Sequence, residues 1–230
     1  MREIVFDTET TGFSFADGDR MVEIGCVELV NRVETGRSFH AYFHPERTMP
    51  PEAQRVHGLS DAFLSDKPLF AHGVDDLLDF LGDSPLVAHN ANFDFGFLNG
   101  ELTRCGRGHI HLDRMVDTLV LARTRHPGAK HSLDALCSRY GIDRSHRTLH
   151  GALLDAQLLA QVYVELTGGR QIGLTLVTET IEVQTSFVPI AAPAVVRPAR
   201  LFEASALELV RHREFMKKIK NPLWGVEASG

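Results

Sequence analysis

The sequence of 230 residues predicts an α/β fold with a mixed five-stranded sheet flanked by helices, followed by a flexible linker and a short C-terminal helical tail. Strand-like segments dominate the first part of the chain. Helical periodicity then alternates with short apolar segments. After residue 170 the composition shifts to proline, alanine and valine. This order of elements is typical of an α/β domain with an appendage.

The expected strands are apolar segments bounded by turn residues. They span residues 3–12, 21–31, 38–43, 85–88 and 115–121. The first runs into a turn ending at Gly12, and the second and third are joined through a turn at residues 34–36.

The expected helices span residues 73–81, 92–105, 132–140 and 151–166. Phe93, Phe97 and Leu102 recur at helical spacing, and Gly168 follows the last helix as a stop signal. The first domain therefore covers residues 1–170.

The net charge of −6 argues against a protein that holds nucleic acid with a broad basic surface. The charge is uneven, because residues 197–230 contain seven Lys or Arg and four Glu, so that residues 1–196 carry −9. Any binding to nucleic acid is therefore expected to be local, assisted by metal or helped by a partner protein.

Apolar runs fall short of the ~20 residues that span a bilayer, and the first residues lack the pattern of a signal peptide. The three cysteines are scattered and form no CxxC pair, which argues against disulfides and structural zinc. We expect a cytoplasmic protein with no membrane partner.

Asp7 and Glu9 stand two apart in an expected strand, so both side chains leave the same face, with α-carbons ~6.5 Å apart. Such close carboxylates repel one another unless a cation lies between them, and Mg²⁺ prefers oxygen ligands. The alternative is a strand end whose acids face solvent. The preceding apolar residues 4–6 favour the edge of a buried strand instead.

Three more polar residues stand next to apolar segments. Asp94 falls in the first turn of a helix, Asp155 lies in an otherwise apolar helix, and His150 precedes that helix. Each has a structural explanation by itself, such as a favourable charge near a helix N-terminus for Asp94.

Taken in order, Asp-x-Glu, Asp and His-x4-Asp resemble the DEDD exonuclease superfamily, in its histidine-bearing branch. The surrounding segments 6–12, 56–59, 89–94 and 150–155 also resemble that family's sequence blocks. The resemblance covers residues 1–170, with no departure at a catalytic position.

The resemblance implies an RNase H-like fold and a metal-dependent 3′→5′ exonuclease. It implies that two divalent ions, Mg²⁺ or Mn²⁺, are held by Asp7, Glu9, Asp94 and Asp155. His150 would be the general base, since its ordinary pKa lies near working pH. The pocket for the 3′-terminal nucleotide would be lined by Thr8, Glu9, Val56, His57 and Phe93. His57 has the alternative of a purely structural turn histidine.

The C-terminal part favours DNA proofreading. Residues 171–200 form an expected extended linker with three prolines after residue 188. Within it, residues 184–189 include Gln184, Thr185, Ser186 and Phe187, which resemble the clamp-binding peptides of bacterial replication proteins. Residues 201–230 resemble the polymerase-binding tail of the epsilon family of bacterial DNA polymerase III, with Leu209, Val210 and Trp224 as expected anchors.

The expected partners are therefore DNA 3′ ends, the polymerase III catalytic subunit and the sliding clamp. Two alternatives stay open. A stand-alone exoribonuclease of the same superfamily uses the same five residues, and a non-catalytic nucleic-acid-binding module would have lost metal ligands.

Overall fold

A computed structural model describes residues 1–145, 149–169 and 204–219. The chain divides into two units, residues 1–176 and 177–230. The described residues of the second unit form one helix, α8 (Ala206–Met216). The strands and the other helices belong to the first unit.

The first unit is built on a mixed sheet of five strands in the order β3-β2-β1-β4-β5. The strands are β1 (Arg2–Thr10), β2 (Met21–Val30), β3 (Val33–Tyr42), β4 (Leu86–Ala88) and β5 (Met115–Asp117). The first three are antiparallel neighbours, whereas β4 pairs parallel with β1 and β5 parallel with β4. The predicted mixed five-stranded sheet is confirmed.

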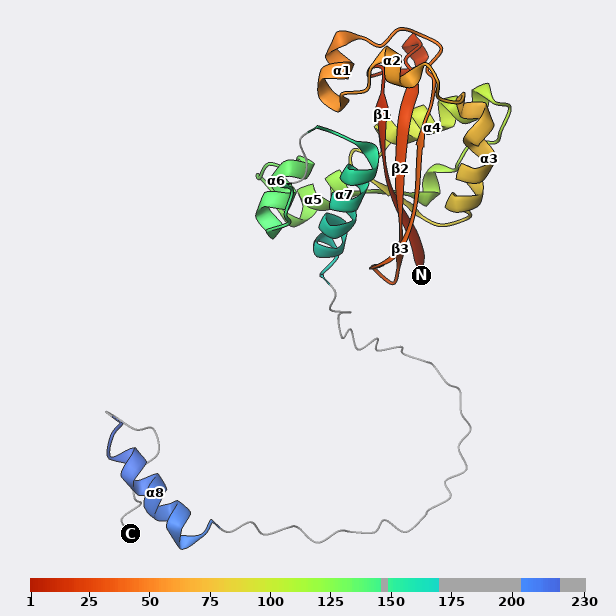
Figure 1. The fold of residues 1–230 in the computed structure, drawn as a ribbon. Helices are drawn as coiled ribbons and strands as arrows, with labels where there is room; N and C mark the ends of the chain where they lie inside the picture. Colours follow the sequence, from red (N-terminus) through yellow and green to blue (C-terminus); the bar gives the residue numbers. More distant parts are fainter. Residues whose placement is uncertain (146–148, 170–203, 220–230) are drawn as a thin grey trace, which may run out of the picture. The chain divides into compact units, whose positions relative to one another are not determined.

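Helices cover both faces of this sheet (Figure 1). The helices of this unit are α1 (Pro51–His57), α2 (Asp61–Leu64), α3 (Phe70–Leu81), α4 (Asn92–Arg104), α5 (Thr118–Arg125), α6 (Leu133–Tyr140) and α7 (Ala152–Leu166), with 3-10 turns at Phe15–Asp17 and Leu112–Arg114. Among the described residues, no helix has the length and apolar character that crossing a membrane requires.

Alternation along β1 divides the core between the two faces. Ile4 and Phe6 point to one side and pack with α3 and α4. Val5 points to the other side and packs with Val27 of β2 and Leu159 of α7. The central strand is therefore buried on both sides, and its carboxyl end carries the polar residues discussed below.

Several predicted boundaries are wrong. The turn between β2 and β3 lies at Asn31 and Arg32, not at residues 34–36, and both residues have positive φ (52° and 64°). A two-residue hairpin loop of this conformation matches the twist of the strands. Gly36 is instead an internal residue of β3, which starts at Val33 rather than at residue 38.

The fifth strand ends at Asp117 rather than at residue 121. The Asp117 side chain accepts a hydrogen bond from the Leu119 amide at 2.8 Å and so caps the start of α5. Helix α1 was also missed, although Pro51 at its first position and Gly58 after its end are recognisable signals.

Candidate active site

The first two acidic side chains lie on one face of β1. Asp7 and Glu9 are two residues apart, so strand alternation places them on the face that α7 covers. In the antiparallel ladder Asp7 lies opposite Gly25. Glu9 lies opposite another buried acid, Glu23. Two carboxylates are therefore held side by side and largely out of water.

Asp94 reaches the same strand from α4, which begins two residues before it. Its Oδ1 accepts two hydrogen bonds from Thr8, at 3.1 Å from the backbone amide and at 2.7 Å from the hydroxyl. The Asp94 side chain is buried. These bonds fix the carboxylate of α4 against the end of β1.

Asp155 and His150 come from the start of α7. The Asp155 amide donates to the Gly151 carbonyl at 2.9 Å in the first helical turn, and its side chain is buried. His150 is exposed, with Nδ1 3.1 Å from Oδ2 of Asp155. The His150 amide donates to the Val56 carbonyl at 3.2 Å, which ties this loop to α1.

These elements converge on one cavity of about 230 Å³. Its walls include Asp7, Glu9, Asp94, His150 and Asp155, together with Thr8, His89, Asn90, Phe93 and Leu133. Potential ligand atoms of Glu9, His150 and Asp155 all lie within 4.8 Å of one another. The structure thus brings together all five residues that the sequence singled out for catalysis.

The charge of this cluster is costly without a cation. Burial raises the pKa of Asp7 well above its usual range, and the negative charges of Asp94, Glu9 and Asp155 raise it further. Burial also raises the pKa of Asp94 to about 7, although hydrogen bonds from Thr8 oppose that shift. A cluster of hard oxygen donors that resist ionisation together fits a divalent cation such as Mg²⁺ or Mn²⁺.

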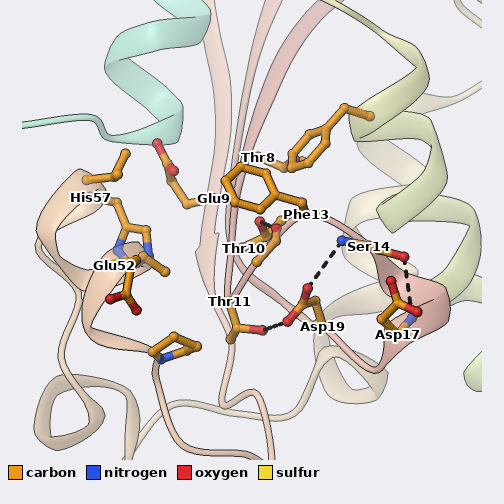
Figure 2. A pocket seen from close by; sticks show the side chains of 15 residues that line it. Thr8, Glu9, Thr10, Thr11, Phe13, Ser14, Asp17, Asp19, Glu52 and His57 are labelled. Atoms are coloured by element: carbon orange, nitrogen blue, oxygen red, sulfur yellow. Dashed lines mark hydrogen bonds between the residues drawn. The ribbon is translucent and has the colours of Figure 1, made fainter.

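A second and larger pocket of about 620 Å³ adjoins this cluster and shares Thr8, Glu9 and Phe93 with it. Figure 2 shows the side chains that line it. All five residues predicted to hold the terminal nucleotide form part of its wall: Thr8, Glu9, Val56, His57 and Phe93.

His57 is buried in this wall, and its two ring nitrogens have different surroundings. Its Nδ1 accepts a hydrogen bond from the Leu59 amide at 3.0 Å, as a turn histidine would. Within the described part of the chain, however, Nε2 is buried and forms no hydrogen bond of normal geometry, although the backbone of Thr10 lies near the ring. Burial lowers the pKa of His57, so the ring is neutral and carries its proton on Nε2. Leaving a buried donor without a hydrogen bond is costly.

The sequence interpretation missed Phe13, which lines the same pocket and is 91% exposed. A large aromatic side chain directly after Gly12 was the available signal. The loop that carries it is closed by Asp19, which accepts hydrogen bonds from the Thr11 hydroxyl and the Ser14 amide (Figure 2).

The predicted partner-binding residues are only partly described. Leu209 and Val210 lie on α8, and both are exposed. Ser205 and Glu208 close a capping box at the start of this helix. The remaining predicted anchors, Gln184, Thr185, Ser186, Phe187 and Trp224, lie outside the described residues.

Comparison with known proteins decides the family. Residues 4–163 match the model of the exonuclease family RNase_T. The chain is 49% identical over 228 residues to DNA polymerase III subunit epsilon of Rickettsia felis, covering 95% of this chain and 97% of that one. This chain belongs to the exonuclease family, among the epsilon subunits of DNA polymerase III.

Other members of the epsilon family agree over similar lengths. The Salmonella typhimurium subunit is 46% identical over 237 residues, with 97% of both chains covered. The Escherichia coli subunit is 49% identical over 176 residues, covering 74% of this chain and 72% of that one. The resemblance stated from the sequence motifs is confirmed.

Solved exonuclease structures share the fold. Exonuclease X in complex with 5′ overhanging duplex DNA superposes with a TM-score of 0.55 at 26% identity, covering 72% of this chain and 90% of that one. Escherichia coli exonuclease I in complex with a 5cy-dT13 oligonucleotide gives a TM-score of 0.61 at 17% identity, covering 74% of this chain and 40% of that one. The second likeness concerns the fold only, and together they confirm the expected RNase H-like architecture.

Proposed function

We propose that this chain is the 3′→5′ exonuclease that proofreads for a bacterial DNA polymerase III, releasing nucleoside 5′-monophosphates from DNA 3′ ends. The observation that carries the proposal is the convergence of Asp7, Glu9, Asp94, Asp155 and His150 on one cavity beside a pocket large enough for a nucleotide. Membership of the epsilon family supports it.

The proposed cofactor is a pair of divalent ions, Mg²⁺ or Mn²⁺, held by Asp7, Glu9, Asp94 and Asp155. When bound, such ions activate a water molecule and stabilise the leaving 3′ oxygen. The chain's own contribution is to hold the carboxylates in place before the substrate arrives. Thr8 does this for Asp94 through two hydrogen bonds, and the first turn of α7 does it for Asp155.

We assign His150 as the general base. Its Nδ1 lies against Oδ2 of Asp155, so a neutral ring donates from Nδ1 and presents its lone pair at Nε2. Nε2 therefore takes the proton of the attacking water. Exposure of the ring lets that proton pass on to solvent.

The larger pocket is proposed to hold the 3′-terminal nucleotide. Val56 and Phe93 supply apolar and aromatic surface for a base or sugar. The Nε2–H of His57, unpartnered among the described residues, donates to an oxygen of that nucleotide. This role makes a histidine preferable to an apolar residue of similar size.

The proposed partners follow from the family and the tail. DNA polymerase III is named in the relatives' descriptions, and we propose its catalytic subunit as the partner of Leu209, Val210 and Trp224. The segment containing Gln184, Thr185, Ser186 and Phe187 is proposed to bind the sliding clamp. Action on replicating DNA would place the protein in the cytoplasm.

The test is digestion of a primer–template with a mismatched 3′ end, with and without the catalytic subunit. We expect faster removal of the mismatched nucleotide when the subunit is present. Parallel assays on labelled RNA and DNA separate the proposal from a stand-alone exoribonuclease, which would prefer RNA. Binding without any cleavage in Mg²⁺ or Mn²⁺ would indicate a non-catalytic module instead.

A further inference from the structure

Gly25 stands in the middle of β2, directly opposite Asp7 in the ladder with β1. Paired residues of an antiparallel ladder point to the same face, so position 25 faces α7 as Asp7 does. Its neighbour on that face, Val27, packs with Ala156 and Leu159 of α7. Glycine in a strand interior weakens the strand and often marks the close approach of another backbone.

The backbone of α7 occupies the space that a side chain at position 25 would need. A Cβ built on Gly25 would lie 2.2 Å from the Leu153 nitrogen, 2.3 Å from its Cα and 2.4 Å from the Ala152 carbonyl carbon. All three are main-chain atoms of the first turn of α7, which runs beside β1 and β2 (Figure 1). No change of side-chain rotamer relieves such a contact.

Other crowded glycines of the described residues differ in this respect. A Cβ on Gly12, Gly58 or Gly100 would meet side-chain atoms, those of Asp19, Leu149 and Phe15 respectively. Side chains can turn aside, whereas the start of a helix moves as a unit. At Gly25 the helix itself would have to retreat.

We infer that Gly25 is a positioning residue of the exonuclease, and that its missing side chain lets α7 carry Asp155 to Asp7. Ordinary contacts between carbon atoms are about 3.5–4.0 Å, so any side chain at position 25 displaces the first turn of α7 by roughly 1 Å or more. Asp155 is the fourth residue of that helix, and His150 lies two residues before the helix begins at Ala152. Both move away from β1 together.

A displacement of this size matters for chemistry more than for folding. Misplacement by about 1 Å can lower a rate by about 100-fold. Disturbing groups that orient metal ligands typically costs 10–100-fold in metal affinity or activity. The pocket assigned to the terminal nucleotide is lined by β1, the loop after it, α1 and α4, not by α7. The pocket meets the start of α7 through the hydrogen bond from the His150 amide to the Val56 carbonyl, so substrate binding should change less than catalysis.

This inference rests on the proposed function, and its test compares full-length Gly25→Ala with Val27→Ala. Val27→Ala loses packing at the same interface of β2 and α7 but adds no bulk. For each protein we would measure kcat and KM on a single-stranded oligonucleotide, Mn²⁺ affinity by calorimetry and Tm. For Gly25→Ala we expect kcat to fall at least about 100-fold, KM to stay within about threefold and Mn²⁺ affinity to fall at least about tenfold.

Val27→Ala should lose a comparable amount of Tm and keep kcat and Mn²⁺ affinity within about threefold of the wild type. The inference is overturned if Gly25→Ala keeps both quantities at the level of Val27→Ala. It is also overturned if the two variants lose them equally. An inactive wild type that also binds no Mn²⁺ would count against the proposed function rather than against Gly25.

If Gly25→Ala does not melt cooperatively, Ala156→Val takes its place. Ala156 is buried in the same cluster, and a larger side chain there lifts α7 from the helix side. The same loss of kcat and Mn²⁺ affinity is expected. A folded Ala156→Val with wild-type values for both would contradict the inference.

Discussion

At the scale of single residues, Asp7 shows the free-energy cost of placing several carboxylates together in a buried site. Burial and four nearby carboxylates raise its pKa in the folded chain, whereas the unfolded chain leaves it near 3.8. At pH values between the unfolded-state pKa and the raised folded-state pKa, the folded state binds more protons than the unfolded state. The stability of the metal-free protein therefore falls as pH rises through that window, and stays low above it.

Replacing Asp7 by Asn removes this penalty. At pH 8 without metal we expect Asp7→Asn to melt at least about 2 °C above the wild type, with the difference vanishing near pH 4. Scanning calorimetry with a chelator present measures it. Asp76→Asn, at an exposed position on α3, serves as the control and should not change Tm.

Adding metal should reverse the order of the two melting temperatures, so that the wild type melts above Asp7→Asn. Saturating Mg²⁺ or Mn²⁺ should raise the Tm of the wild type well above that of Asp7→Asn, because ligand binding stabilises only a protein that binds it. A wild-type Tm that is indifferent to both ions would contradict the assignment of this cluster to metal.

His150 is the second residue with a sharp expectation. A general base contributes typically 10²–10⁴-fold, so His150→Ala should slow hydrolysis by that order while Mn²⁺ still binds. His72→Ala, at an exposed position on α3, should leave the rate unchanged. The measurements are single-turnover rates and calorimetric titrations. A rate within threefold of the wild type would remove His150 from the base role.

At the scale of elements, the loop between β1 and β2 is held to α4 by a buried ion pair. Arg20 donates to both carboxylate oxygens of Glu101, at 2.7 and 2.8 Å, and both side chains are buried. Glu101 also accepts from the Met21 amide at 3.2 Å. The position of the loop that carries Phe13 therefore depends on α4.

Breaking this pair should destabilise the protein strongly. Glu101→Ala leaves the Arg20 guanidinium buried with only its contacts to residues 45 and 46, which typically costs about 3–5 kcal/mol. We expect Tm to fall by roughly 10 °C. Arg104→Ala, which breaks the exposed pair with Glu46, should cost less than about 1 kcal/mol. Similar losses for the two variants in thermal melts would show that the buried pair is not decisive.

At the scale of the whole molecule, the exonuclease unit and the tail are expected to work separately. On α8, Leu209, Val210 and Phe215 are exposed. A helix of 11 residues is marginal in water without a surface to pack on. These observations favour a role in binding a partner protein rather than in catalysis.

Truncation after residue 185 tests this separation. The shortened chain should digest single-stranded DNA within about twofold of the full-length rate, since all the residues of both cavities precede the cut. It should lose stable binding to the polymerase catalytic subunit in gel filtration. Trp224→Ala should weaken binding in part, because aromatic anchors often dominate small interfaces. Equal binding by the truncated chain would eliminate the tail as the docking element.

Much of the site followed from local spacing. Asp7 and Glu9 share a face because strands alternate, and the His-x4-Asp pattern put His150 just before the helix that carries Asp155. The order of the motifs was enough to identify the family. These features depend on residues close in sequence, where backbone geometry alone sets the relation between side chains.

The tertiary structure decided everything that depends on residues distant in sequence. The absence of a hydrogen-bond partner for His57 Nε2 among the described residues and the close approach of α7 to Gly25 have no signature in local spacing. From the sequence alone, a glycine inside a strand indicates only a weaker strand. The need for glycine at position 25 becomes clear once the position of α7 is known. The sequence by itself determined which side chains are available for catalysis. Packing between β2 and α7 determined whether those side chains lie close together, because the distance between two elements is set by the side chains that separate them.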